Sequence, residues 1–137
     1  MRGSMQSYRK VSVESDLSVA SPHRIIQMLF AGALERLAQA KCAIEQGNIA
    51  QRGLFMGKAI GIVSGLNSSL NMDAEGDVAI NLTRLYDYML RRMSDANINN
   101  DAQAIDEVVA ILKAIKEGWD AIPIDKHNIS SHTEEAR

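Results

Sequence analysis

Apolar residues recur every three or four positions along this sequence, and this spacing constrains the fold more than any other feature. It gathers apolar side chains on one side of a helix with 3.6 residues per turn. Because the segments that show it are joined by short polar connections, they favour an antiparallel bundle. We therefore predict an all-α fold, an antiparallel four-helix bundle. The four stripes are Ile26, Leu29, Ala33, Leu37, Ala40 and Ile44; Ala59, Ile62, Val63, Leu66 and Leu70; Val78, Leu82, Leu85, Met89 and Ala96; and Ile105, Val108, Leu112, Ile115 and Trp119.

The first two helices have clear start and stop signals. Ser21 is a good N-cap and Pro22 occupies the favoured first helical position, so the first helix should begin there. Gly47 is placed to end this helix as a C′ glycine. Asn48, three residues before Gln51, has the spacing of a capping-box variant and should open the second helix.

The later boundaries are predicted from polar turns. Residues 72–77 should form the turn before the third helix, and residues 97–101 the turn before the fourth. Asn100 and Gln103 again have capping spacing, which predicts that Asn100 opens the fourth helix. Pro123 should end it.

The organisation predicted from these signals is a single bundle with two appended ends. Residues 21–122 form the bundle in this interpretation. Residues 1–20 are polar with isolated apolar positions and are predicted to be a flexible N-terminal arm. Residues 123–137 mix charged residues, Ser and His without periodicity and are predicted to be a disordered tail.

Composition excludes several classes of function. The chain of 137 residues has a formal net charge of −2, which provides no strong field for nucleic acid or an anionic membrane. Aromatic residues make up 4%, too few for the stacking platforms of a single-stranded nucleic-acid binder. The longest uncharged run, residues 59–72, is too short and too polar to span a bilayer. We expect a cytoplasmic protein that inserts in no membrane and binds no nucleic acid.

Residues with catalytic or metal-binding chemistry are sparse. Of the three histidines, His23 lies at a helix start, and His127 and His132 lie in the tail. The Glu-x-x-His pairs of a di-iron bundle are missing. The single cysteine, Cys42, excludes an intramolecular disulfide and has no motif of a nucleophile. We therefore expect no enzyme activity, no cofactor and no metal.

The apolar arcs are wider than one buried seam needs, because a stripe of about 100° suffices for that purpose. In the third helix Tyr86, Leu90 and Met93 widen the arc, and Val109 widens that of the fourth. One interpretation is that a small bundle buries more than half of a central helix. The other is a second apolar surface for a partner.

Glycine recurs every four residues in the second helix, at Gly53, Gly57, Gly61 and Gly65. This stripe lies roughly opposite the predicted core side. Each interior glycine costs about 0.5–1 kcal/mol relative to alanine. The stripe therefore indicates either a soft, solvent-facing helix or a surface that the backbone of a partner approaches closely.

Five stretches, taken together and in order, carry a resemblance to a known family. They are residues 8–11, residues 21–34, residues 58–62 with 66–70, residues 81–92 with 96–97, and Glu107-Val108 with Trp119. The stretch in the third helix is the most specific. On these residues the chain resembles the flagellar export chaperone family, FliS.

This resemblance implies a specific function. Proteins of this kind bind the disordered C-terminal segment of flagellin, which folds into helices along the outside of the bundle. Binding prevents premature polymerisation, and the complex is presented to the gate of the type III export apparatus. The N-terminal segment around its tyrosine covers part of the apolar groove in the free protein, a role that would fall here on Tyr8 and Val11.

We expect the partner-binding residues to come from the arm and three of the helices, with Tyr86 and Met93 as the better outer candidates because they lie off the centre of their stripe. The predicted positions are Tyr8, Val11, Ile62, Leu66, Leu70, Leu82, Leu85, Tyr86, Met89, Met93, Val109 and Leu112. Two other functions remain open. The wide arcs would also suit a self-associating structural protein, such as a weak homodimer, or a general adaptor for helical ligands.

Overall fold

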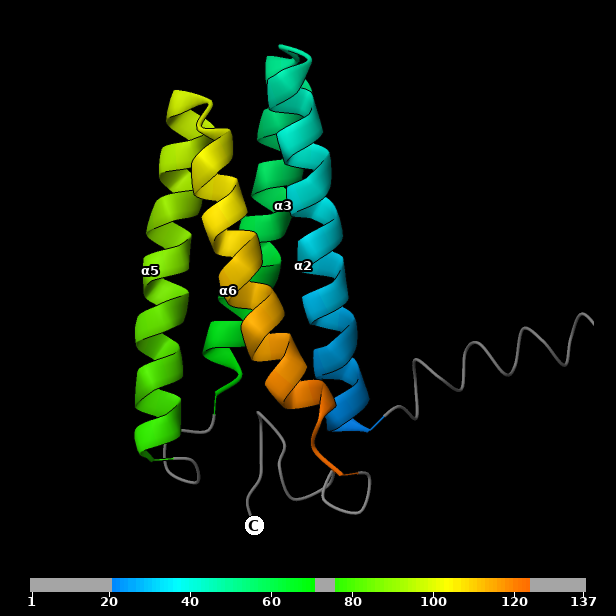
Figure 1. The fold of residues 1–137 in the computed structure, drawn as a ribbon, viewed down its shortest axis with the longest axis vertical. Helices are drawn as coiled ribbons and strands as arrows, with labels where there is room; N and C mark the ends of the chain where they lie inside the picture. Colours follow the sequence, from blue (N-terminus) through cyan, green and yellow to red (C-terminus); the bar gives the residue numbers. More distant parts are fainter. Residues whose placement is uncertain (1–20, 71–75, 124–137) are drawn as a thin grey trace, which may run out of the picture.

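The structure, a computed structural model, describes residues 21–70 and 76–123 and contains four helices within them. These are α2 (Pro22–Glu45), α3 (Ile49–Ser68), α5 (Asp77–Asn99) and α6 (Ala102–Asp120). They form an antiparallel bundle, so the predicted fold class is confirmed (Figure 1). The predicted arm at 1–20 and nearly all of the predicted tail lie outside the described residues.

Each helix packs against the next one in the chain, and α2 packs against α6 to complete the bundle. The contact between α2 and α3 is the most extensive of the four. Buried alanines on both helices, including Ala33, Ala40 and Ala59, allow the two backbones to approach closely. Gly32 adds to this approach, because a Cβ built on it would lie 3.5 Å from Cδ1 of Ile62.

The first two predicted caps are confirmed. The Ser21 side chain accepts a hydrogen bond from the Arg24 backbone N–H at 3.1 Å. Asn48 Oδ1 accepts one from the Gln51 backbone N–H at 3.0 Å and opens α3. Between them Gly47 has a φ of +72°, a conformation that glycine adopts without the steric cost of a Cβ.

The prediction for the connection between α5 and α6 was wrong. Asn100 does not open α6: it has a φ of 53° and ends α5 in the left-handed conformation that asparagine tolerates. The side chain of Asp101 caps α6 instead and accepts hydrogen bonds from the backbone of Gln103 and Ala104. Because α5 continues to Asn99, the turn predicted at 97–101 contains only two residues outside the helices.

The core runs between all four helices and ends in an aromatic pair. The rings of His23 and Trp119 stack with centroids 4.7 Å apart. Trp119 Nε1 donates a hydrogen bond to the His23 carbonyl oxygen at 3.0 Å, which joins the start of α2 to the end of α6. Trp119 is 8% exposed, so its predicted place in the core is confirmed.

The seam of α5 is rotated from the predicted one. Ala79, Tyr86, Met89, Met93 and Ala96 are fully buried, whereas Val78 and Leu85 from the predicted stripe are 61% and 39% exposed. The two seams share Met89 and Ala96, and their mean directions lie about 45° apart around the helix. The observed seam buries Tyr86 and Met93 in place of Val78 and Leu85, and these larger side chains remove more apolar area from water.

Candidate partner-binding site

Val78 and Leu85 lie on the side of α5 that faces α6. They precede Arg92 at intervals of seven residues, which places all three on nearly one line along the helix. Arg92 contacts α6 directly, because its Nε donates a hydrogen bond to Glu107 Oε1 at 2.8 Å. The first part of this line therefore presents exposed apolar side chains toward the C-terminal half of α6.

The side of α6 that faces Val78 and Leu85 carries side chains too small to cover these two residues. Ala114 and Gly118 follow Glu107 at helical spacing and are both exposed. A Cβ built on Gly118 would meet no atom within 4 Å, so the space beside it is open. Ile111 and Ile115 lie toward the core from this line and are partly buried.

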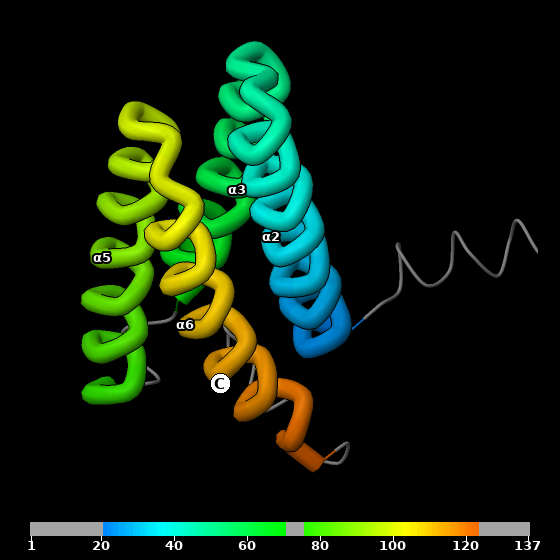
Figure 2. The backbone as a smooth tube through the Cα atoms, turned by 45° about the horizontal axis from the view of Figure 1, so that its top comes forward, coloured from blue at the N-terminus to red at the C-terminus, as the bar shows by residue number. Residues whose placement is uncertain are grey.

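The two helices diverge where this apolar surface lies. Both views show α5 and α6 close together near their connection and farther apart toward the start of α5 and the end of α6 (Figures 1 and 2). We call the surface on these separated ends the α5–α6 apolar face. It consists of Val78, Leu82 and Leu85 on α5 and Ile111, Ile115 and Gly118 on α6.

A polar cluster occupies the other half of the contact between α5 and α6. Both oxygens of the Glu107 carboxylate accept hydrogen bonds from α5, one from Tyr88 Oη at 2.5 Å and one from Arg92 Nε at 2.8 Å. Arg92 also lies 4.0 Å from the Asp101 carboxylate in the cap of α6. We call Tyr88, Arg92, Asp101 and Glu107 the polar clamp.

Hydrogen bonds within the clamp shift the pKa values of Glu107, Tyr88 and Arg92. Hydrogen bonds from Tyr88 and then from Arg92 lower the pKa of the Glu107 carboxyl below its usual value. The hydrogen bond that each of them donates to Glu107 also raises the pKa of the Tyr88 hydroxyl and the pKa of the Arg92 guanidinium. All three shifts favour the protonation states that these groups hold at neutral pH, so the clamp is intact there.

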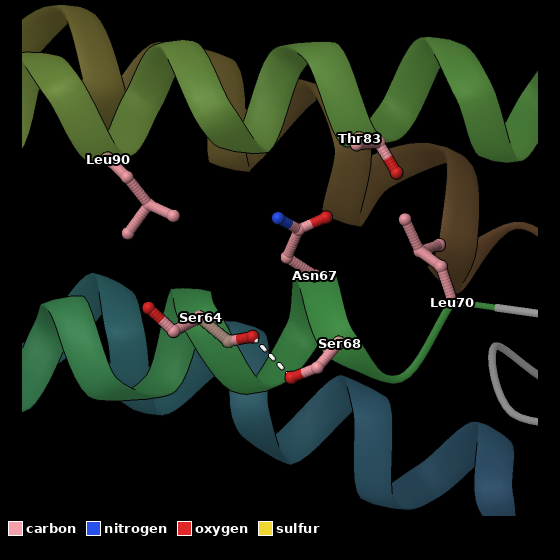
Figure 3. Close-up of a pocket in the computed structure, with 6 residues that line it drawn as sticks. All are labelled: Ser64, Asn67, Ser68, Leu70, Thr83 and Leu90. Atoms are coloured by element: carbon pink, nitrogen blue, oxygen red, sulfur yellow. Dashed lines mark hydrogen bonds between the residues drawn. The ribbon is translucent and has the colours of Figure 1, made fainter.

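A second depression lies on the opposite side of α5, against α3. It is an open hollow of about 410 Å³ lined by Ser64, Asn67, Ser68, Leu70, Thr83 and Leu90. In Figure 3 Leu90 and Thr83 extend from α5 toward the α3 residues, with Asn67 between the two helices. Asn67 Nδ2 donates a hydrogen bond to Asp87 Oδ1 at 3.1 Å and so bridges α3 and α5.

The glycine stripe of α3 faces away from the core, as predicted. Gly57, Gly61 and Gly65 are exposed and Gly53 is partly exposed. A Cβ built on any of the four would meet no atom within 4 Å. Nothing in the described part of the chain therefore requires glycine at these positions by packing.

The structure separates the predicted binding residues into three groups. Leu66, Tyr86, Met89, Met93 and Leu112 are fully buried, so the prediction that Tyr86 and Met93 lie on the outer flank was wrong. Both point into the core because the seam of α5 is rotated. Partly buried or exposed positions are Ile62, Leu70, Leu82, Leu85 and Val109. Tyr8 and Val11 lie outside the described residues.

Only some of the predicted residues come together on one surface. Leu82 and Leu85 belong to the α5–α6 apolar face, and Leu70 lines the hollow between α3 and α5. Ile62 lies against α2 at Gly32. Val78 was placed in the core and is the most exposed apolar residue of the face.

The sequence interpretation missed Glu107 as a bridging residue. Tyr88 and Arg92 are four residues apart, so they share a side of α5, and this spacing is the signal that points to a common partner. The partner itself could not be found without the register of α5 against α6. Across residues 21–70 and 76–123, the structure contains no group of three His, Cys, Asp or Glu side chains that could hold a metal. Nor does any helix in these ranges have the length and apolar character to cross a membrane.

Comparison with known proteins identifies the family. A family model described as flagellar protein FliS matches residues 4–126. The chain belongs to the FliS family. It is 52% identical over 131 residues to the flagellar secretion chaperone FliS of Vibrio cholerae, and the alignment covers 96% of each chain.

Other FliS relatives match at similar coverage. The flagellar secretion chaperone FliSB of Pseudomonas aeruginosa is 49% identical, with 86% of this chain and 94% of the relative covered. The corresponding FliS of Salmonella typhimurium is 46% identical, with 86% and 88% covered. The resemblance drawn from five short stretches is therefore confirmed over most of the chain, and family membership supports a role as an export chaperone.

Proposed function

We propose that this protein is a cytoplasmic flagellar secretion chaperone that binds the C-terminal segment of flagellin on the α5–α6 apolar face. The observation that carries the proposal is the exposure of Val78 and Leu85 beside a glycine, on the surface of a FliS-family bundle. A bundle that buried all of its apolar residues would leave no such surface.

The geometry of the face fits an amphipathic helix. Apolar side chains on two diverging helices leave a strip into which a third helix can insert residues at i, i+3, i+4 and i+7. The exposed Gly118 and Ala114 allow the backbone of such a helix to come close to α6. Val78 and Leu85 would then contact its apolar side along two turns.

A ligand that folds as it binds needs a large apolar surface. Ordering a disordered segment costs about 2–5 kcal/mol of the gross interaction energy. The hollow between α3 and α5 extends the available surface around α5, with Leu70 and Leu90 as its apolar residues. We propose that a long flagellin segment continues from the α5–α6 apolar face into this hollow.

Sequestering this segment would prevent flagellin from polymerising before export, and the complex would then be delivered to the gate of the export apparatus. We further propose that Tyr8 and Val11 compete for the same apolar surface in the absence of flagellin. Both steps rest on the family resemblance of the sequence.

A calorimetric titration with a peptide spanning the C-terminal segment of flagellin from the same organism tests the proposal. We expect one-to-one binding, a large negative heat-capacity change and a gain of helix by circular dichroism. A Val78→Ser, Leu85→Ser double variant should bind at least tenfold more weakly, since each substitution removes apolar contact worth about 1 kcal/mol or more.

Ile98→Ser is the matched control, because Ile98 is an apolar residue of the same helix that is 76% exposed near its other end. The control should retain wild-type affinity. Absence of binding by the wild-type protein would refute the proposed function, whereas equal losses in the double variant and the control would refute the proposed location.

A further inference from the structure

We propose that Glu107 is a positioning residue for partner binding: by tying α5 to α6 near their connection, it sets the separation of the helix ends that carry the α5–α6 apolar face. This inference rests on the proposed function, because it concerns how the same surface is kept ready for a helical partner. Polar contacts join α5 and α6 on one part of the pair, and the apolar face lies on the other part.

Glu107 holds α5 at two points. Its two carboxylate oxygens accept hydrogen bonds from Tyr88 and Arg92, which lie one helical turn apart. A carboxylate that accepted a single bond would allow α5 to rotate about that contact. Two bonds to successive turns fix both the rotation and the position of α5 along α6.

Arg92 extends this restraint to the connection itself. It lies near Asp101, whose side chain also caps the first turn of α6 through Gln103 and Ala104. The end of α5 and the beginning of α6 are therefore held in one polar cluster. Nη1 of Arg92 also lies 3.4 Å from Oδ2 of Asp95, which is on the same helix.

The opposite ends of the two helices are held to other helices: Trp119 and Asp120 bond the end of α6 to α2, and Asp87 bonds α5 to α3. There Val78 and Leu85 are exposed, and the space beside Gly118 is open. Apolar contacts have little directionality, so they do not by themselves fix the angle between helices. Because the restraint lies near the connection and the apolar face lies beyond it, a small rotation at Glu107 becomes a larger displacement at the face.

The restraint affects partner affinity through the fraction of molecules whose apolar face is open. The end of α6 stays bonded to α2 through Trp119. Without the restraint at Glu107, the start of α5 would therefore sample arrangements in which it closes over the apolar side chains of α6. The apparent affinity for a partner falls by the fraction of molecules that remain competent to bind. If that fraction drops to about one tenth, affinity falls about tenfold.

A pair of adjacent substitutions on α6 provides the test. Glu107→Ala removes the contact with α5, whereas Asp106→Ala removes an ion pair with Lys41 on α2 at 2.8 Å. Both changes remove one carboxylate from a partly solvated interhelical contact of α6. Only the first should affect the spacing of α5 and α6.

The spacing is measured by pulsed electron paramagnetic resonance between spin labels at Asn81→Cys and Glu117→Cys, with the exposed Cys42 replaced by serine. We expect the distance distribution to broaden in Glu107→Ala and to stay as in the wild type in Asp106→Ala. Tyr88→Phe, which removes one of the two donors, should broaden it less and gives a milder variant if Glu107→Ala does not fold.

The flagellin peptide is then titrated into the unlabelled variants. Glu107→Ala should bind about tenfold more weakly than Asp106→Ala. Superimposable distance distributions in the two variants would overturn the inference, as would a broadened distribution with unchanged affinity. If the wild-type protein does not bind the peptide, the proposed function fails, while the distance measurement still decides whether Glu107 sets the spacing.

Discussion

Replacing glycines of the α3 stripe by alanine should stabilise the protein. Gly57 and Gly61 lie in the interior of α3, on its exposed side, and an added Cβ at either position would meet no atom within 4 Å. The substitution therefore gains helix propensity without a steric penalty. Each alanine should contribute about 0.5–1 kcal/mol, mainly because glycine loses more backbone freedom on folding.

The Gly57→Ala, Gly61→Ala double variant should therefore gain about 1–2 kcal/mol in the free energy of unfolding. For a domain of this size, such a gain raises Tm by about 5–10 °C. Thermal unfolding followed by circular dichroism at 222 nm measures it, and chemical denaturation at constant temperature gives the free energy independently.

Gly47→Ala is the control, because Gly47 has a φ of +72° and an L-residue there is strained whatever the space around it. It should lower stability by about 1–2 kcal/mol. A double variant that melts at or below the wild-type temperature would refute the reasoning, since it would mean that the exposed side of α3 contacts another part of the protein.

Three further predictions concern the binding surface and the polar clamp. Gly118→Trp should fill the open space beside α6 and reduce flagellin-peptide binding at least tenfold in calorimetry, whereas Gly118→Ala should bind normally; normal binding by the tryptophan variant would exclude this surface. The lowered pKa of Glu107 means that its stabilising contribution is complete above its ordinary value of 4.5 and is lost as pH falls through the folded-state pKa. Glu107→Gln should therefore lower the urea midpoint at pH 7 and leave it nearly unchanged at a pH below the folded-state pKa of Glu107. A difference in midpoint that persists at that low pH would contradict the stabilising role of the Glu107 carboxylate. Deleting residues 1–17 should tighten peptide binding if the N-terminal arm only competes, and weaker binding would show that it contributes contacts.

The helices and two of their caps could be predicted because the signals are local. The side chain of Ser21 and that of Asn48 each satisfy a backbone N–H three residues on, which requires no knowledge of the rest of the fold. The prediction that Asn100 opens α6 was wrong because of the same local character of the signals. An asparagine suits both an N-cap and a left-handed C-cap, and with Asp101 beside it the sequence offers two candidates for one cap.

The orientation of α5 could not be predicted from its sequence. Leu85 and Tyr86 each belong to an apolar stripe, and the helical period does not say which of two adjacent stripes faces inward. Packing against the neighbouring helices α3 and α6 decides this, because Tyr86 with Met93 fills the core that Leu85 would leave incompletely filled. The error exchanged the inner and outer candidates, so residues expected to bind the partner are buried.

The same limit applies to the candidate site. The exposure of Val78 follows from the rotation of α5, and the bridge from Glu107 depends on the register between two helices. Neither property is encoded within one segment. The glycine stripe shows the converse case: its outward direction was predicted from the period alone, since the core side of α3 was marked clearly by Ala59, Val63 and Leu66.

The central claim is that the flagellin segment binds on the α5–α6 apolar face, and a methyl NMR titration with the flagellin peptide tests it most directly. Labelled isoleucine, leucine and valine methyl groups report on the whole surface in one experiment. We predict that Val78, Leu85 and Ile115 shift on binding while the exposed Ile49 and Ile98 do not. Shifts confined to Ile49 and Ile98, with Val78 and Leu85 unchanged, would contradict the account.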